Sequence, residues 1–559
     1  MNPKLFKIVL LVGSLLVMIA TVTIAVVTDK PYNGSNDDII DVEVFDDLQY
    51  SISTVILPPF VSKIGHPILT PTNHLLFTYV NSTTNEDGLG LCDLNGTNFR
   101  IIYNETIKTL PGSNGLRLMP FADNRRVATG DYVIETYPNL DECDPSLTRL
   151  VPINYPPELL EDDKVLFRWS EIIIAPDNIH YAWTTLHASL GAVNFIGRLE
   201  NQTGNYSIEK AQIISDYRFV NEDSSHPGYL KVVDYFHGGE IKQFSHGGAK
   251  ITLAGAGKQG LAKSVIQDLL TNESHPLVQE PGYEETTIIS PDGQLGLTMS
   301  TRFSPSTNCA ILGLLPRPLS ILTLMGMSQV AYTYSVTDVR TTRIGNVGPA
   351  LIDIKKSVAN RTYHGHDLHD PSDNQQWVFS SPMSWDTTST IGIWPEKNRK
   401  DRNEVRIRKV MIHTSENSTY KPGKPIPIQD TPDTVPFGRP LSELKNVVLR
   451  NIAGKIEGVK GNREESYMDY EYASTYINTT YHDFSEDGKV FANGYEIYTV
   501  DRSKGETTYT GNVSLSGEDK GKMDFKLVFA GNPLKLMKNQ SYGYSMYHGQ
   551  TIHVEDMAE

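Results

Sequence analysis

The chain has 559 residues, 66 acidic and 50 basic side chains, a formal net charge of −16 and a hydrophobic fraction of 39%. This hydrophobic fraction predicts a folded core, and the negative charge argues against nucleic acid and anionic membrane surfaces as partners, because both would repel the chain. The sequence contains only three cysteines, so the fold is not a disulfide framework. Cys92 and Cys143 can pair in an oxidising compartment, which leaves Cys309 over.

The N-terminus predicts a membrane anchor. Two lysines precede an uncharged, mainly apolar run from Ile8 to Val27, and acidic residues follow it. A helix of this length spans about 30 Å, enough to cross a bilayer, and the charge distribution keeps the N-terminus in the cytosol. We therefore expect a cytoplasmic stub and signal-anchor helix over residues 1–29, a stem over 30–50 and an extracytoplasmic domain over 51–559. Thr23 and Ala25 provide an alternative cleavage site, which would give a secreted product.

Glycosylation motifs support an extracellular or lumenal location. Asn-x-Ser/Thr occurs along the whole chain, at Asn33, Asn81, Asn95, Asn104, Asn201, Asn205, Asn272, Asn360, Asn417, Asn478, Asn512 and Asn539. The motif is short and arises by chance, but its even distribution behind an export signal is typical of a glycoprotein with exposed loops.

Internal repetition indicates the fold class. A small polar turn followed by a short strand recurs seven times, beginning at Thr70, Phe121, Ala175, Ser245, Ser290, Ser384 and Ser485. Turns such as Ser-Pro-Asp-Gly combine a side-chain oxygen, a fixed φ and a residue that tolerates positive φ, as a tight turn between strands requires. The pattern predicts an all-β fold, a β-propeller with seven blades favoured and six possible. The best candidate helix is the segment from Leu261 to Thr271.

Propeller geometry predicts where functional side chains gather. Residues before each turn belong to the innermost strand and lie near the central channel. Reading back three to five residues gives His66, Arg117, Glu171, Glu240, Glu285, Ser380, Tyr481 and His482. Acidic and basic groups are therefore expected to converge, although a slip of one residue turns a side chain away.

The segment from Tyr229 to Glu396 resembles the fungal saponin hydrolase family. The specific parts are PGYEET from Pro281, TTR-x-GN-x-GPAL from Thr341 and SPMSW from Ser381. The similarity extends less strongly from Leu57 to His553. It implies cleavage of the glycosidic bond between a glucuronic acid and a triterpenoid aglycone. The predicted anchor departs from a freely secreted hydrolase, and no catalytic residue is assigned from the resemblance.

The residues themselves suggest a carboxylate pair. Glycosidic cleavage requires one carboxylic acid to protonate the leaving oxygen and one carboxylate to activate water or attack the sugar. Glu171 and Glu285 are the best pair, with Glu284 and Glu240 as substitutes. They belong to the third and fifth repeats and should face each other across part of the channel, at a separation that favours inversion.

Binding of a uronic acid requires cations and polar groups. Arg117 and Arg302 are the best candidates for holding the sugar carboxylate, and Arg340 and Arg343 are weaker ones. His66 and His482 are candidate substrate-binding residues near two turns. The alternative for each arginine is a structural clamp between blades.

Histidines suggest a rival hypothesis. His364, His366 and His369 form a dense tract with carboxylates that can bind a divalent ion, but a solvated loop between blades is the favoured interpretation. Convergence of three among His66, His226, His237 and His482 would indicate a metal-dependent lyase acting on uronates.

Three functions follow. The first is a saponin-hydrolase-like glycoside hydrolase without a cofactor or metal. Its partners are a small glycoside and, through the N-terminal helix, a membrane. The second is a non-catalytic, membrane-tethered propeller that binds a glycan or protein, and the third is the metal-dependent lyase. Two carboxylates in one polar site favour the first, and carboxylates buried within the blades favour the second.

Overall fold

The computed structural model describes residues 48–559, apart from 188–190, 216–219, 233–238, 257–261, 281, 304–314, 324–347, 371–375, 402, 415–419, 447–450, 471–473, 532–534 and 557–559. The predicted anchor and most of the stem lie outside the described residues, as do Cys309, Arg340 and Arg343. No helix in the described part of the chain is both long and apolar enough to cross a membrane.

Six antiparallel blades form a β-propeller, which confirms the predicted all-β class. Their innermost strands are in contact from the second blade through the third, fourth, fifth and sixth to the first, and a shared apolar cluster joins the first blade to the second. From the inside outward, the first blade contains β2 (Val61–Leu69), β3 (Leu75–Asn81), β4 (Asp87–Cys92) and β5 (Arg100–Tyr103), and the second contains β6 (Met119–Pro120), β7 (Arg126–Ala128), β8 (Tyr132–Glu135) and β9 (Arg149–Asn154). The third contains β10 (Val165–Ile174), β11 (His180–His187), β12 (Gly191–Gln202) and β13 (Asn205–Ser215), and the fourth contains β16 (Glu240–Ser245), β17 (Lys250–Ala256), β18 (Ala262–Asp268) and β19 (Ser274–Pro276). The fifth contains β20 (Glu284–Ile289), β21 (Leu295–Ser300), β22 (Gly348–Asp353) and β23 (His366–Asp367).

The sixth blade closes the ring with both ends of the propeller sequence. It contains β24 (Trp377–Phe379), β25 (Ser384–Trp385), β26 (Ile391–Asn398) and β27 (Val405–Ile412). Its outer strand β27 pairs antiparallel with β1 (Tyr50–Thr54) from the start of the described chain. The backbone groups of β27 that would face solvent are therefore satisfied by a strand more than 350 residues earlier in sequence, as in the pairing of Thr54 with Arg408.

The repeated turns join the first strand of each blade to its second. The turns that begin at Thr70, Phe121 and Ala175 each place an asparagine with φ between 56° and 67° at their fourth position. Asparagine tolerates this left-handed conformation better than most residues, which explains its recurrence. The turns also link neighbouring blades, because the Asn73 side chain accepts a hydrogen bond of 2.8 Å from the backbone N–H of Thr387.

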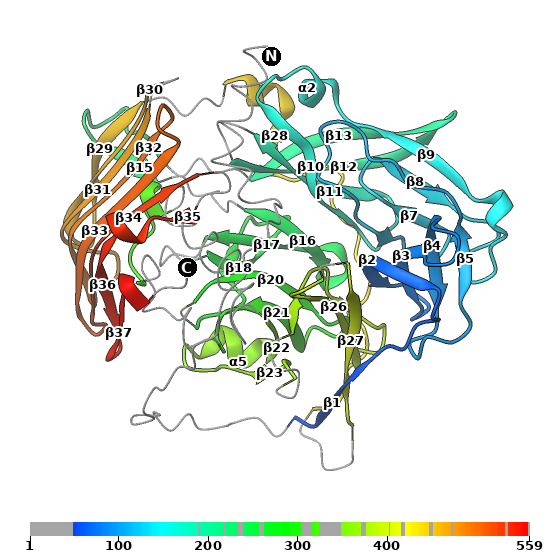
Figure 1. Cartoon of the computed structure of the whole chain (residues 1–559). Helices are drawn as coiled ribbons and strands as arrows, with labels where there is room; N and C mark the ends of the chain where they lie inside the picture. The colour runs from blue at the N-terminus through cyan, green and yellow to red at the C-terminus, as the bar shows by residue number, and fades with distance from the viewer. Residues whose placement is uncertain are drawn as a thin grey trace.

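The C-terminal region forms a separate antiparallel sheet rather than a seventh blade. Its strands are β29 (Ile452–Glu457), β30 (Lys460–Tyr470), β31 (Ser474–Ser485), β32 (Val490–Asp501), β33 (Glu506–Gly517), β34 (Gly521–Ala530), β35 (Lys535–Leu536), β36 (Tyr542–Tyr547) and β37 (Gln550–His553). Figure 1 shows this sheet, orange to red, at one side of the propeller. The seventh turn, at Ser485, joins β31 to β32 within it. The prediction of seven blades is therefore wrong, because the same local turn chemistry closes a hairpin in either kind of sheet.

The remaining elements are short. They are η2 (Pro145–Leu147), α2 (Pro157–Leu160), β14 (Val220–Glu222), β15 (Leu230–Val232), η3 (His246–Gly248), α5 (Ile354–Ala359), β28 (Arg439–Pro440), η7 (Leu441–Asn446), η8 (Lys538–Gln540) and η9 (Val554–Asp556). The predicted helix after Leu261 is wrong: the segment forms β18, which pairs with strands on both sides. Cys92 and Cys143 are not bonded to each other, since both are free thiols.

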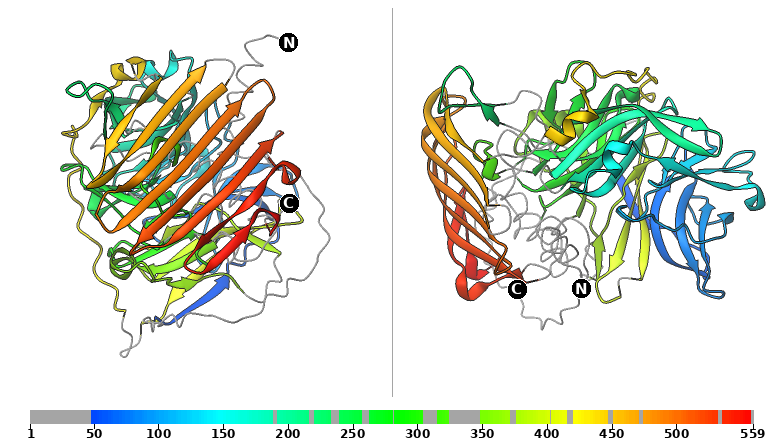
Figure 2. Two further views of the ribbon diagram at one scale, coloured as in Figure 1. Left: turned by 90° about the vertical axis from the view of Figure 1, so that its left-hand side faces the viewer. Right: turned by 90° about the horizontal axis from the view of Figure 1, so that it is seen from above.

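A segment between β21 and β22 joins the fifth blade to the C-terminal sheet. Leu315, Ile321 and Leu322 are buried in one apolar cluster that also contains Leu297 of β21 and Phe525 of β34. The propeller and the C-terminal sheet therefore share a continuous core through this segment. Figure 2 shows the propeller and the sheet from two further directions.

Candidate functional site

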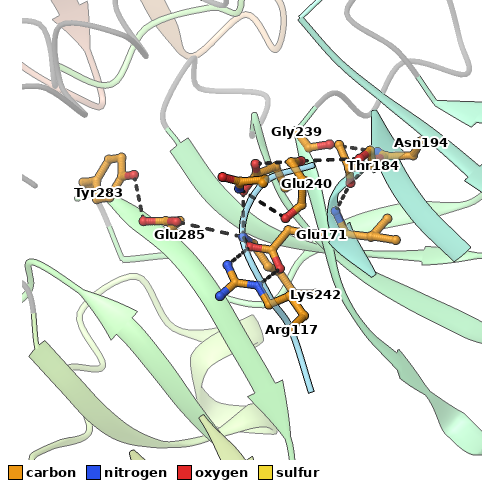
Figure 3. A network of polar contacts seen from close by, with 12 residues as sticks. Arg117, Glu171, Thr184, Asn194, Gly239, Glu240, Lys242, Tyr283 and Glu285 are labelled. Carbon is orange, nitrogen blue, oxygen red and sulfur yellow. Dashed lines mark hydrogen bonds and ion pairs between the residues drawn. The ribbon is translucent and has the colours of Figure 1, made fainter. Parts of the chain in front are cut away.

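Four consecutive blades contribute charged side chains to one network. Arg117 precedes β6, Glu171 lies in β10, Glu240 and Lys242 lie in β16, and Glu285 lies in β20. Figure 3 shows these side chains pointing toward one another from neighbouring inner strands. The predicted convergence is thus observed for Arg117, Glu171, Glu240 and Glu285.

Arg117 and Glu171 form a bidentate ion pair. Arg117 Nε donates to Glu171 Oε2 at 2.9 Å, and a terminal guanidinium nitrogen donates to Oε1 at 2.7 Å. This parallel geometry is the strongest that the two groups can adopt, and it fixes the orientation of both planes. Both carboxylate oxygens of Glu171 are occupied in this state.

Lys242 connects the three glutamates. Its Nζ lies 2.9 Å from Glu240 Oε2, 3.3 Å from Glu171 Oε1 and 3.9 Å from Glu285 Oε1. The Lys242 side chain is only 7% exposed. Two cations thus face three carboxylates, so the network carries an excess negative charge when all five groups are ionised.

The shared charges perturb the pKa values of the network. Burial raises the pKa of the Glu171 carboxyl, but attraction to Arg117 and Lys242 outweighs it, so the net shift is downward. Burial lowers the pKa of the Lys242 ammonium, and the three carboxylates overcome this effect and raise it well above its ordinary value. Glu171 therefore stays ionised near neutral pH, as a general base or nucleophile requires.

Glu285 is held more loosely than Glu171. Its Oε2 accepts a hydrogen bond of 3.3 Å from the Tyr283 hydroxyl, and its side chain is 23% exposed. Since Lys242 Nζ is 3.3 Å from one Glu171 oxygen and 3.9 Å from one Glu285 oxygen, these oxygens are at most 7.2 Å apart. This upper bound admits both the shorter separation of retaining glycosidases and the longer separation of inverting ones.

Buried polar contacts fix the strand that carries Lys242. The Thr184 hydroxyl accepts from the backbone N–H of Ile241 at 3.0 Å and donates to Asn194, which in turn donates to the Gly239 carbonyl at 2.8 Å. The Ser170 hydroxyl donates to Glu240 at 3.2 Å. Figure 3 shows this support behind the ionic network. The third blade therefore positions the fourth.

His66 of β2 lies within the electrostatic reach of the same network. Burial lowers the pKa of its imidazole to about 3, Arg117 and Lys397 add to the effect, and Glu171 opposes it. His66 is consequently a neutral imidazole near neutral pH. Its backbone φ is 51°, a strained conformation for a residue with a Cβ.

Glu284 and Arg302 belong to a different cluster. The Arg302 guanidinium binds Glu284 and Glu280 and donates to the His364 carbonyl at 2.8 Å, and Lys263 Nζ lies 3.6 Å from Glu284. The side chains of Glu284 and Arg302 are each 1% exposed. The sequence hypotheses that Glu284 is catalytic and that Arg302 binds substrate are therefore not supported by their positions, because both are consumed in internal ion pairs.

His482 does not reach the channel. It lies in β31 of the C-terminal sheet, is 51% exposed and is 3.9 Å from Glu464 on the neighbouring strand. Its predicted position beside the substrate followed from counting the seventh turn as a blade. Tyr481 shares this error, whereas Ser380 follows β24 in the sixth blade.

The histidines that the structure describes do not converge on a metal-binding point. His66 lies in β2, His226 in the turn between β14 and β15, and His482 in β31, whereas His237 lies outside the described residues. In the tract, His364 contacts Glu280 and His369 contacts Asp367. Among the described residues, no group of three or more histidine, cysteine or acidic side chains has a metal-binding arrangement.

Lys242 is the central residue that the sequence reasoning missed. Alternation along a strand did not provide a reliable signal, because the pairing of β16 with β17 is irregular at Lys242. Tyr283 was missed as well, and it stands two residues before Glu285.

Comparisons with known proteins add little to this description. No family model and no curated protein sequence matches the chain. Solved structures similar to it include a putative TolB from Agrobacterium tumefaciens, with 10% identity, coverage of 56% of this chain and 83% of that one, and a TM-score of 0.31. The propeller domain of the Trilobed protease from Pyrococcus furiosus is 10% identical, and the match covers 66% of this chain and 99% of that one with a TM-score of 0.31. Oligogalacturonate lyase from Vibrio parahaemolyticus is 8% identical, and the match covers 64% of this chain and 81% of that one with a TM-score of 0.29. These low scores say nothing about activity, and the propeller assignment rests on the sheet topology.

Proposed function

We propose that the chain is a glycoside hydrolase of the saponin hydrolase type, which cleaves the bond between a glucuronic acid and a triterpenoid aglycone. The observation that carries the proposal is the position of Lys242 between Glu171, Glu240 and Glu285, with Arg117 beside them. Hydrolysis of a glucuronide needs carboxyl groups to cleave the glycosidic bond and cations to bind the sugar carboxylate. Both types of group meet in this network at the inner strands.

The two reacting carboxylates have different environments. Glu171 is kept ionised by Arg117 and Lys242, which suits the general base or nucleophile. Glu285 has a tyrosine hydroxyl and a more distant ammonium as neighbours, and its greater exposure suits the acid that protonates the leaving oxygen. Separate environments of this kind allow two carboxyl groups to take opposite roles at one pH.

The cations in the network suit a uronic acid. The Arg117 side chain is more exposed than that of Lys242, so we assign Arg117 to meet the sugar carboxylate and Lys242 to hold the glutamates in register. Neutral His66 is an additional hydrogen-bonding group for the sugar.

The test is hydrolysis of a panel of glucuronide and hexoside saponins by the full chain. Glu171→Gln and Glu285→Gln should each lower turnover by about 100-fold or more, because the amide keeps the shape but cannot transfer a proton. On a glucuronide with an activated leaving group, Glu285→Gln should regain much of its rate and Glu171→Gln should not. Glu518→Gln, an exposed change in the C-terminal sheet, is the control. Release of no aglycone from any saponin would refute the proposal.

A non-catalytic, glycan-binding propeller is the second candidate. The occupation of both Glu171 oxygens by Arg117 favours it, because a reacting carboxylate must free one oxygen. Titration calorimetry with glucuronides distinguishes the two. Binding without turnover, weakened by Arg117→Met and unaffected by Glu285→Gln, would support the binding function.

A further inference from the structure

The outer face of the C-terminal sheet contains two glycosylation motifs side by side. In β31, Asn478 and Thr480 alternate with the buried residues Ile477 and Thr479. In β33, Asn512 likewise alternates with buried neighbours, including Val513. Because successive side chains of a strand point to opposite faces, both asparagines point away from the face that packs on the segment between β21 and β22 that contains Leu315, Ile321 and Leu322. Figure 2 shows the uncovered outer face of this sheet.

The strand register places the two motifs on the same face. Directly paired residues share a face, and Tyr495 of β32 is paired with Thr480 on one side and with Asn512 on the other. Asn478 is paired with Ile497, two residues further along β32. The two asparagines are therefore about 10 Å apart across the strands and about 7 Å apart along them, or about 12 Å in all, with one strand between them.

An aromatic side chain adjoins each asparagine. Tyr476 stands two residues before Asn478 on the same face of β31, and neither residue is buried. Tyr495, which is 41% exposed, lies directly opposite Asn512. Tyrosine left exposed on a sheet face has an apolar ring without cover, and the C–H face of a pyranose packs on such rings.

The acceptor geometry is also present within one motif. The Asn478 side-chain amide donates to the Thr480 hydroxyl at 3.4 Å, so the two residues of the motif that a glycosylating enzyme reads lie together. The asparagines of ten of the twelve motifs lie within the described residues, and none of the ten is buried. Asn478 and Asn512 are distinguished from the others by central positions in long strands.

We propose that Asn478 and Asn512 carry N-linked glycans whose first N-acetylhexosamine packs on Tyr476 and Tyr495, respectively. In the transfer, the asparagine amide nitrogen bonds to the anomeric carbon of a lipid-linked oligosaccharide and gives up a proton. The bond from that carbon to the lipid pyrophosphate breaks, and the pyrophosphate leaves. The glycans cover the outer face, while the inner face holds the propeller. This inference requires entry into a glycosylating compartment and does not depend on the proposed hydrolase activity.

Peptide mapping tests the modification. The full chain, with its own N-terminus, is produced in a eukaryotic host and treated with a glycan-removing amidase in heavy-oxygen water, which converts each occupied asparagine to labelled aspartate. Both positions should carry the label. Thr480→Ala should remove only the label at 478, and Ser514→Ala only that at 512. Thr508→Ala, on the same face but outside any motif, should remove neither.

Thermal unfolding tests the packing. The increase in Tm of the intact glycoprotein over its enzymatically deglycosylated form should shrink in Tyr476→Ala and Tyr495→Ala. Because both forms of each variant carry the same substitution, the difference between their Tm values removes the effect of the substitution on the unglycosylated sheet. An unlabelled Asn478 or Asn512 overturns the assignment for that residue, and labels elsewhere in the same digest show whether export failed. An unchanged Tm difference in both tyrosine variants overturns the packing.

Discussion

Arg317 and Glu496 form a fully buried ion pair between the fifth blade and the C-terminal sheet. Arg317 Nε donates to Glu496 Oε1 at 2.6 Å, a terminal nitrogen donates to Oε2 at 2.5 Å, and the Tyr509 hydroxyl donates to Oε2 at 2.6 Å. The two residues are 179 positions apart in sequence. Nearby, the backbone N–H of Ile321 donates to Glu465 at 3.0 Å, which gives the same segment a second attachment.

Removing one charge of this pair should destabilise the protein strongly. Glu496→Gln leaves the Arg317 guanidinium buried without its counter-ion, and we expect a loss of about 3–5 kcal/mol in the free energy of unfolding. Urea unfolding monitored by tryptophan fluorescence and circular dichroism measures the loss. Glu518→Gln, in the exposed pair with Lys489, should change the stability by less than about 1 kcal/mol. Equal effects of the two changes would contradict a buried role for Glu496.

His66 should make stability fall as the solution becomes acidic. Below its ordinary pKa of about 6.5 the unfolded chain protonates this histidine, whereas the folded protein does so only near pH 3. The folded state therefore loses stability as pH falls between these values, by at most about 1.4 kcal/mol per pH unit.

The variant His66→Asn isolates this contribution, since asparagine tolerates the positive φ and does not titrate. Urea midpoints measured from pH 7 to pH 4 should fall less steeply for the variant than for the wild type. Parallel pH profiles would show that folding does not lower the pKa of His66.

Asn73 should stabilise the first turn by two separable effects. Asn73→Gly retains the backbone conformation, whose φ is 64°, but loses the hydrogen bonds to Thr387 in the sixth blade, at a cost of about 1 kcal/mol. Asn73→Ala loses the same bonds and adds about 1 kcal/mol of backbone strain. Urea unfolding should therefore rank the wild type above the glycine variant and the glycine variant above the alanine variant. A more stable alanine variant would be inconsistent with the left-handed turn.

Adjacent glutamates of β20 should respond differently to the same change. Glu284→Gln weakens a buried cluster in which Arg302 and Lys263 depend on the carboxylate, so the loss should be mainly in stability. Glu285→Gln removes a partly exposed carboxyl from the channel network, so the loss should be mainly in turnover. Urea unfolding and saponin hydrolysis are measured on both variants. If Glu284→Gln lowers mainly turnover and Glu285→Gln lowers mainly stability, the active site lies instead in the Arg302 cluster.

Turn chemistry is local, and the sequence alone located it correctly. All seven turns lie where the pattern placed them, because the residues that set a turn are adjacent in the chain. The number of blades was not available from this pattern. Ser485 begins a turn as good as that at Ser290, yet its strands pair within the C-terminal sheet. Which sheet a hairpin joins depends on contacts with distant segments, which turn residues do not encode.

Counting back from the turns also located most of the channel network. Arg117, Glu171 and Glu285 are found together because each stands near the same level of an inner strand. The tertiary structure decided the rest. Glu284 enters the buried Arg302 cluster, whereas its neighbour Glu285 faces Lys242, which joins carboxylates from three blades. Alternation in a sequence tells which side chains share a strand face, but only the packing of blades distant in sequence decides which faces meet and which charges neutralise one another.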